Sequence, residues 1–361
     1  MFFPKKMVGV DIGTSSIKIV EISRWGKGIT LENYGEIQSV FIYQEPSVNG
    51  SPTCQAAKKD SNHLSTNFVA RAVRGILDEA RIKTRQVVFS IPDFSTFCTS
   101  FEMPAMPDNE IPGAIRFNAA QYITLPISEV TLDWKIISGN PASADKTKEK
   151  LKVFLAAIPN QIVQEYQNIA KAAGLELYAL EGEAMGITRA LTKNNKKTVC
   201  LLDIGVQSST VNIVDNGFLR RSYSFNFYSS KLASAVASAL GITQQEAEHI
   251  KNTEGILSKR QGVSETLYLL IDPLLREVQG ISAEFAQAER KPVEEMYIIG
   301  GTANLPGLKE YFAESLQKPV HVPNCFADLL YPPILEETLK DMSPGFAVSV
   351  GAALGGIESK N

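Results

Sequence analysis

Two related stretches stand out in this chain: Val8-Gly9-Val10-Asp11-Ile12-Gly13-Thr14-Ser15-Ser16 and Leu201-Leu202-Asp203-Ile204-Gly205-Val206-Gln207-Ser208-Ser209. Each is a short apolar run that ends in Asp, then a turn with Gly and small polar residues, then a second apolar run. This order predicts a β-hairpin with little side-chain bulk at its tip, where backbone N–H groups can face an anion. One such hairpin can also be a tight turn with a capping Asp. Two copies, one in each half, predict a duplicated fold that holds a polyphosphate from both sides.

The composition is that of an ordinary globular protein. The 361 residues are 44% hydrophobic and 21% charged, which is enough for two or more domains with their own cores. A net charge of −3 argues against nucleic acid as a partner. The cysteines and histidines are scattered, so we expect neither a zinc site nor a histidine-based catalytic triad. No apolar run reaches the roughly 18 residues that span a bilayer, and no signal peptide is recognisable, so we expect a cytoplasmic protein.

The first half is expected to form a sheet that is interrupted by an insertion. Strands are predicted over 8–42, a helix over 68–80 and a buried strand over 87–92. A separate strand, helix, strand, strand series is predicted over 97–158. The polar stretch 44–67 between the first strands and the helix is assigned no function.

The second half repeats the pattern, beginning at the second hairpin. Its further elements are expected to be three helices, a strand and a short final helix, over 228–239, 243–252, 264–290, 296–299 and 346–354.

The two turns carry the groups that a phosphate site in a sheet needs. These are backbone amides at a tight turn, small side chains, and a carboxylate that holds magnesium through water. Asp11 and Asp203, at the strand ends, are the expected magnesium residues, and Lys18 is expected to reach a phosphate oxygen. The expected phosphate-binding residues of the turns are Gly13, Thr14, Ser15, Ser16, Gly205, Gln207 and Ser208.

Three further places are candidates for nucleotide contact or catalysis. Gly300-Gly301-Thr302, after an apolar strand, would let adenine or an α-phosphate lie against the backbone. Glu248 and Lys251 share one helical face, where they form either a surface ion pair or contacts to ribose and adenine. Glu181, before a helix that joins the halves, is either a general base that orients a water molecule or an acid that interacts with the helix dipole.

Taken in order, these segments resemble the five motifs of the actin/Hsp70/sugar-kinase superfamily. The resemblance implies an α/β fold of duplicated ribonuclease-H-like (actin-like ATPase) domains, with ATP and Mg²⁺ in the cleft between them. The matching segments are 8–20 and 201–214 for the phosphate motifs, 181–191 and 346–354 for the connecting helices, and 298–308 for the adenosine motif.

The insertion is similar to the extra subdomain of the cell-division protein FtsA, and differs from the insertions of actin, Hsp70 and sugar kinases. FtsA continues past its second connecting helix into an amphipathic membrane anchor, which we do not expect in residues 355–361. The implied divisions are the first actin-like domain (1–92 and 161–197), an FtsA-type inserted subdomain (93–160), the second actin-like domain (198–229 and 292–345), a helical subdomain (230–291), and the second connecting helix with a tail (346–361).

A compact FtsA-like chain of this kind resembles the PilM family of type IV pilus assembly proteins. The resemblance rests on Lys5-Lys6 before the first motif and on the run Gly300-Gly301-Thr302-Ala303-Asn304-Leu305-Pro306-Gly307-Leu308. It implies a cytoplasmic, ATP-binding component of the inner-membrane pilus platform. Its expected partner is the N-terminal cytoplasmic peptide of the membrane protein PilN, held in a groove beside the inserted subdomain. Other platform proteins and motor ATPases are further candidate partners, and the protein is expected to be a monomer or to self-associate weakly.

Three functions fit these expectations: a nucleotide-dependent adaptor, a turnover ATPase in which Glu181 positions water, and an FtsA-like cell-division or filament-forming ATPase. The sequence favours nucleotide binding over hydrolysis, which we expect to be slow at most. A ligand that binds two conformations with different affinity shifts their equilibrium without any general base.

Overall fold

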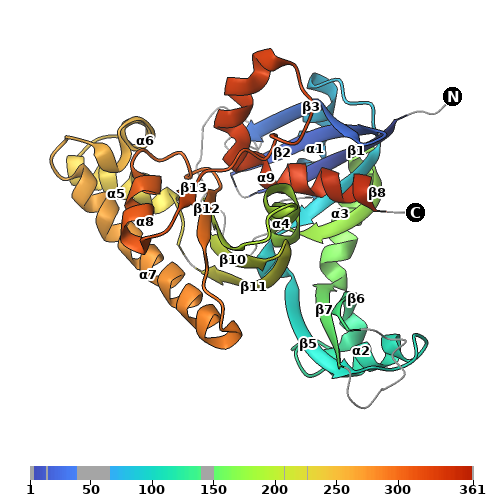
Figure 1. The fold of residues 1–361 in the computed structure, drawn as a ribbon. Coiled ribbons are helices and arrows are strands. Elements are labelled where there is room, and N and C mark those ends of the chain that lie inside the picture. Colours follow the sequence, from blue (N-terminus) through green and yellow to red (C-terminus); the bar gives the residue numbers. More distant parts are fainter. Residues whose placement is uncertain are drawn as a thin grey trace.

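The computed structural model describes residues 4–13, 15–38, 66–139, 150–206, 208–225 and 227–359. Two expected phosphate-binding residues, Thr14 and Gln207, lie outside these ranges, as does most of the polar stretch 44–67. The described residues form two five-stranded sheets and one three-stranded sheet with their helices (Figure 1).

The first sheet contains the N-terminal hairpin and has the strand order β3-β2-β1-β4-β8. Its strands are β1 (Lys5–Ile12), β2 (Ser16–Trp25), β3 (Gly28–Gln38), β4 (Gln86–Ile91) and β8 (Glu176–Gly182). The first three are antiparallel neighbours, whereas β4 runs parallel to β1 and β8 parallel to β4. Val8 and Val10 of β1 face a core formed with α1 (Thr66–Glu79) and α3 (Asn160–Ala173). Because side chains alternate along a strand, Met7 and Gly9 face the other side of the sheet.

The second sheet repeats this order and these strand directions as β11-β10-β9-β12-β13. The duplication predicted from the two hairpins is therefore confirmed. Its strands are β9 (Thr198–Ile204), β10 (Ser209–Asp215), β11 (Phe218–Phe225), β12 (Glu295–Ile299) and β13 (Val320–His321). The accompanying helices are α5 (Ser230–Leu240), α6 (Gln244–Thr253), α7 (Val263–Glu289) and α8 (Leu308–Leu316).

The insertion between β4 and α3 forms a small sheet of its own, as its strand, helix, strand, strand pattern predicts. The strand order is β5-β7-β6, and both pairings are antiparallel. Its elements are β5 (Phe97–Pro104), α2 (Ile111–Ala119), β6 (Val130–Ser138) and β7 (Lys150–Pro159). Ile115 of α2 and Leu151, Val153 and Leu155 of β7 are fully buried in a separate core. In Figure 1 this unit projects from the lower right of the molecule.

Two helices tie the halves together, and each packs against the sheet of the other half. The helix α4 (Glu183–Thr192) follows the first sheet but contacts β10 and β11, whereas α9 (Glu336–Glu358) follows the second sheet but packs on β1, β2 and β4. They meet in the centre of the molecule (Figure 1). The expected short helix over 346–354 is only part of α9, which continues through Pro344.

Short 3₁₀ turns connect several elements: η2 (Asp93–Ser95), η3 (Ile127–Glu129), η4 (Gly255–Leu257) and η5 (Pro333–Leu335). None of the helices within the described ranges combines the length and the apolar character needed to cross a membrane.

Candidate functional site

The two predicted phosphate hairpins meet at one cavity of about 320 Å³, which also reaches the end of β12 and the first half of α9. The expected site residues that line it are Asp11, Gly13, Ser15, Ser16, Lys18, Asp203, Gly205, Ser208, Gly300 and Gly301. The tertiary structure thus brings together residues that lie almost 300 positions apart in the sequence.

Three other residues that were expected to contact the nucleotide do not line the cavity. Glu248 and Lys251 pair with each other along α6, and only Glu248 has an exposed side chain. Neither they nor Thr302 belong to the described residues that line the cavity, although Thr302 is buried next to Gly301. The structure therefore shows the ion pair, and contact of these residues with ribose and adenine stays a prediction.

The two turns close with the same backbone hydrogen bond, and both leave little room for a side chain at their glycine. Gly13 N–H donates to the Ser16 carbonyl and Gly205 N–H to the Ser208 carbonyl, both at 3.0 Å. A Cβ atom at Gly13 would lie 3.0 Å from that carbonyl oxygen, and one at Gly205 would lie 2.7 Å away, so a larger residue would open either turn. Gly301 differs, because a Cβ atom there would meet no atom within 4 Å. The cavity therefore has two tight turns and one bare stretch of backbone, which suits a phosphorylated ligand.

The carboxylates of Asp11, Glu183 and Asp203 line the cavity, and a further acid, Asp93, is hydrogen-bonded to the segment of Glu183 without lining the cavity. Burial raises the pKa of Asp203 to about 7 and that of Asp93 to about 6, and the nearby Asp11 and Asp93 add to the effect at Asp203. Burial also raises the pKa of Glu183, with further repulsion from the three aspartates. For Asp11, burial raises the pKa against the opposing effects of Lys18 and of a 3.0 Å hydrogen bond from Ser90 Oγ. Buried carboxylates that raise one another's pKa attract a cation, because a positive charge stabilises their ionised forms.

The donor chemistry fits a hydrated magnesium ion. Mg²⁺ prefers oxygen ligands and often keeps several waters, so one or two carboxylates suffice to hold it. Among the residues that the structure describes, no three acidic, histidine or cysteine side chains are placed to ligate a metal directly. Asp11 and Asp203, which line the cavity from equivalent strands of the two sheets, are the candidate residues for such an ion.

Lys18 provides the positive charge at the first turn. Its Nζ donates to Ser16 Oγ at 2.7 Å and lies 3.6 Å from a carboxylate oxygen of Glu36, and its side chain is only 16% exposed. An amine held at this point can contact a phosphate oxygen as a compact charge.

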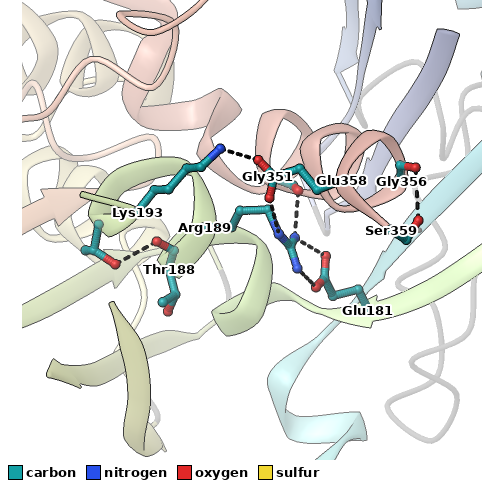
Figure 2. A network of polar contacts seen from close by, with 9 residues as sticks. Glu181, Thr188, Arg189, Lys193, Gly351, Gly356, Glu358 and Ser359 are labelled. Carbon is teal, nitrogen blue, oxygen red and sulfur yellow. Dashed lines mark hydrogen bonds and ion pairs between the residues drawn. The ribbon is translucent and has the colours of Figure 1, made fainter. Parts of the chain in front are cut away.

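Glu181, the expected general base, faces away from the other acids. Its carboxylate pairs with both terminal nitrogens of Arg189, with 2.6 Å between Arg189 Nη1 and Glu181 Oε2 (Figure 2). Arg189 Nη1 also donates to the carbonyl of Gly351 in α9 at 2.8 Å. Glu181 is therefore part of the contact between the connecting helices.

Glu183 lines the cavity instead. In a continuous strand these two acids would share a face, but β8 ends at Gly182 and Glu183 opens α4, which changes the direction of its side chain. In the sequence, Gly182 is the signal that could have located this boundary between β8 and α4.

Asp93, which sequence reasoning missed, does not line the cavity but supports the segment of Glu183 that does. Its Oδ1 accepts a hydrogen bond from the Ala184 N–H at 3.0 Å, and its own N–H donates to Glu183 Oε2 at 3.4 Å. No local pattern marks this residue, because its partners lie about ninety positions further along the chain.

Two sheets of matching topology, crossed by two connecting helices and facing one acidic cavity, define an actin-like ATPase fold, here with an inserted three-stranded sheet. The chain belongs to the family described as type IV pilus assembly protein PilM, whose model matches residues 9–357.

Two known structures and one known sequence are similar to this chain. A PilM-PilN type IV pilus biogenesis complex superposes with a TM-score of 0.79 at 22% identity, covering 98% of this chain and 99% of that one. The ethanolamine utilization protein EutJ from Carboxydothermus hydrogenoformans has a TM-score of 0.58 at 17% identity, covering 98% and 90%. The cell division protein FtsA of Staphylococcus epidermidis is 21% identical over 87% of this chain and 73% of its own length.

Proposed function

We propose that this protein binds ATP with Mg²⁺ in the cavity between its two sheets and acts as a nucleotide-dependent adaptor in type IV pilus assembly. The observation that carries the proposal is the convergence of both glycine turns, Lys18 and the paired aspartates on one cavity, in a chain of the PilM family. Membership of an actin-like ATPase fold supports nucleotide as the ligand.

In this proposal each group has a distinct role. The amides of the turns at Gly13 and Gly205 hold the phosphates from opposite sides, with Lys18 on a phosphate oxygen. Asp11 and Asp203 hold Mg²⁺ through its water shell, and the bare backbone at Gly301 faces the nucleoside. Bound Mg²⁺ would neutralise the facing phosphates and carboxylates. Glu248, Lys251 and Thr302 contribute if the nucleoside extends past Gly301 toward α6.

Binding rather than turnover is the proposed basis of the function. Glu183 replaces Glu181 as the candidate for orienting a water molecule, because it is the acid that lines the cavity. An adaptor needs only a difference in nucleotide affinity between two arrangements of its halves. We therefore propose slow hydrolysis at most.

The proposed partner is the N-terminal cytoplasmic peptide of PilN, docked beside the inserted three-stranded sheet. The solved structure with TM-score 0.79 is that of a complex between PilM and PilN, and this chain covers nearly all of its matched chain. Through such partners the protein would be held at the inner membrane.

The nucleotide site is tested by calorimetric titration of Mg–ATP into the wild type, Asp11→Asn and Asp203→Asn. We expect each substitution to weaken binding by at least about tenfold, or about 1.4 kcal/mol, because each removes a charge that holds the ion. Asp108→Asn, a change in an exposed acid of the insertion, is the matched control and should bind as the wild type does. Equal affinities in all four proteins would contradict the assignment of the cavity.

The partner is tested with a synthetic peptide that copies the cytoplasmic N-terminus of the PilN protein from the same organism. One-to-one binding supports the adaptor, and a dependence on Mg–ATP would show that the sites communicate. Absence of binding with and without nucleotide would contradict the adaptor role and leave the nucleotide site standing.

The similarity to FtsA over 87% of the chain supports one alternative, an FtsA-like filament-forming ATPase. Sedimentation with Mg–ATP separates the two proposals: polymers would pellet, whereas an adaptor would stay in the supernatant.

A further inference from the structure

The inserted sheet begins at the edge of the nucleotide cavity. The chain leaves β4 through Pro92, forms the 3₁₀ turn η2 and then enters β5 at Phe97. Pro92 and Phe94 line the same cavity as Glu183, the first residue of α4. A ligand in the cavity is therefore within reach of the first residues of the insertion.

Two reciprocal hydrogen bonds join this segment to α4. The Asp93 carboxylate accepts from the Ala184 N–H at 3.0 Å, which satisfies one of the free amides at the start of the helix. In return, the Asp93 N–H donates to the Glu183 carboxylate at 3.4 Å. Each residue thus supplies a side-chain acceptor for a backbone donor of the other segment, as in a capping box formed between distant parts of the chain.

The two bonds differ in strength. At 3.0 Å the first has ordinary length, whereas 3.4 Å lies beyond the usual range for N–H···O bonds. The longer bond ends on the carboxylate of Glu183, which is the group that faces the cavity. A nucleotide and its cation can compete for this carboxylate at little cost while the first bond persists.

The other end of the insertion has separate contacts. Where β7 passes into α3, Asn160 accepts a hydrogen bond from Thr131 Oγ1 at 2.8 Å and donates to the Ser128 carbonyl at 2.9 Å. These bonds tie the insertion to α3, whereas η2 ties it to the cavity and to α4. The insertion is connected to the rest of the chain at these two points, and the connection at Asp93 is therefore the one in a position to respond to a ligand.

We propose that the Asp93–Glu183 pair is the link through which nucleotide in the cavity sets the position of the inserted sheet. This inference rests on the proposed nucleotide site. Asp93 acts as a positioning residue: it holds the N-terminus of α4 and the start of β5 together, so a shift of Glu183 toward a bound nucleotide is passed to β5.

Hydrogen–deuterium exchange of the full chain, with and without saturating Mg–ATP, tests the link. In the wild type, nucleotide should change exchange both at the phosphate turns and in residues 97–104. In Asp93→Ala, nucleotide should still bind within about threefold, but the change in 97–104 should be lost. Asp93→Asn keeps a side-chain oxygen for the Ala184 N–H and should restore the response. Asp108→Ala is the matched control within the insertion and should behave as the wild type does.

The outcomes separate this inference from the function on which it rests. A wild type that binds Mg–ATP without any change in 97–104, or an Asp93→Ala protein that keeps the change, overturns the link alone. Failure to bind Mg–ATP overturns the proposed function as well. If Asp93→Ala does not fold, Glu183→Ala at saturating nucleotide serves instead, because it removes the carboxylate that accepts from the Asp93 N–H. A Glu183→Ala protein that keeps the response in 97–104 would again overturn the link.

Discussion

Gly186 of α4 and Gly351 of α9 lie backbone to backbone where the two connecting helices cross. A Cβ atom built on Gly351 would overlap the carbonyl group of Gly186, and one on Gly186 would lie 3.2 Å from the Val348 carbonyl oxygen. Arg189 strengthens the crossing through its hydrogen bond to the Gly351 carbonyl. Because each helix packs on the sheet of the other half, the geometry of this crossing determines how the halves are held relative to each other.

Gly351→Ala is expected to lower the free energy of unfolding by about 1–3 kcal/mol, the usual cost of overpacking a tight contact. Urea unfolding measures the change. Gly280→Ala, in α7, is the matched control: its Cβ atom would meet no atom within 4 Å, so the loss of backbone freedom in the unfolded chain should stabilise the protein by about 0.5–1 kcal/mol. Equal stabilities of the two variants would show that the helices do not cross this closely.

Gly300 and Gly301 are expected to respond differently to substitution. Gly300 has φ +85° and a Cβ atom there would overlap the Asp203 carboxylate, so Gly300→Ala should destabilise the fold. Gly301→Val should leave thermal unfolding nearly unchanged, because the side chain enters open space, and should weaken Mg–ATP binding by about tenfold. Unchanged nucleotide affinity in Gly301→Val would argue that the ligand does not pass over this backbone.

The roles of Glu181 and Glu183 can be distinguished by substituting each of them with Gln. Glu183→Gln should lower any phosphate release about 100-fold, the lower range for loss of a general base. Glu181→Gln should leave turnover per folded molecule intact and lower stability, because it weakens the pair with Arg189. The reverse pattern would restore Glu181 as the catalytic candidate.

The raised pKa values at the cavity predict how stability depends on pH without ligand. Asp203, with a pKa of about 7, and Asp93, with a pKa of about 6, hold protons in the folded protein that the unfolded chain releases near pH 3.8. Their stabilising effect is complete below pH 4 and is lost as the pH rises to about 7, by at most about 1.4 kcal/mol per pH unit for each group. Urea unfolding in magnesium-free buffer between pH 5 and 8 should therefore show a steeper fall for the wild type than for Asp203→Asn. Parallel curves would contradict the assigned pKa of Asp203.

Much of the fold followed from local patterns. The apolar runs that end in Asp11 and Asp203 predicted equivalent strands, since a strand buried on both faces has apolar residues at successive positions. Glycine and small side chains predicted the turns, because close backbone approach requires them whatever surrounds the turn. The insertion was recognisable for the same reason, as each of its elements has its own periodicity.

Other features depend on contacts that no local pattern encodes. The apolar run over 346–354 predicted a short helix, yet α9 begins at Glu336 and continues through Pro344, whose carbonyl accepts the Gly300 N–H at 2.9 Å. Glu248 and Lys251 have the spacing of either an ion pair or a ligand contact, and only packing shows that they pair. Local sequence was thus sufficient for the duplicated sheets and the glycine turns, whose requirements lie within a few residues. The direction of Glu181 toward Arg189, of Glu183 toward the cavity and of Asp93 toward α4 depended on segments far apart in the chain, because a carboxylate acquires its role from the charges and donors that folding places around it.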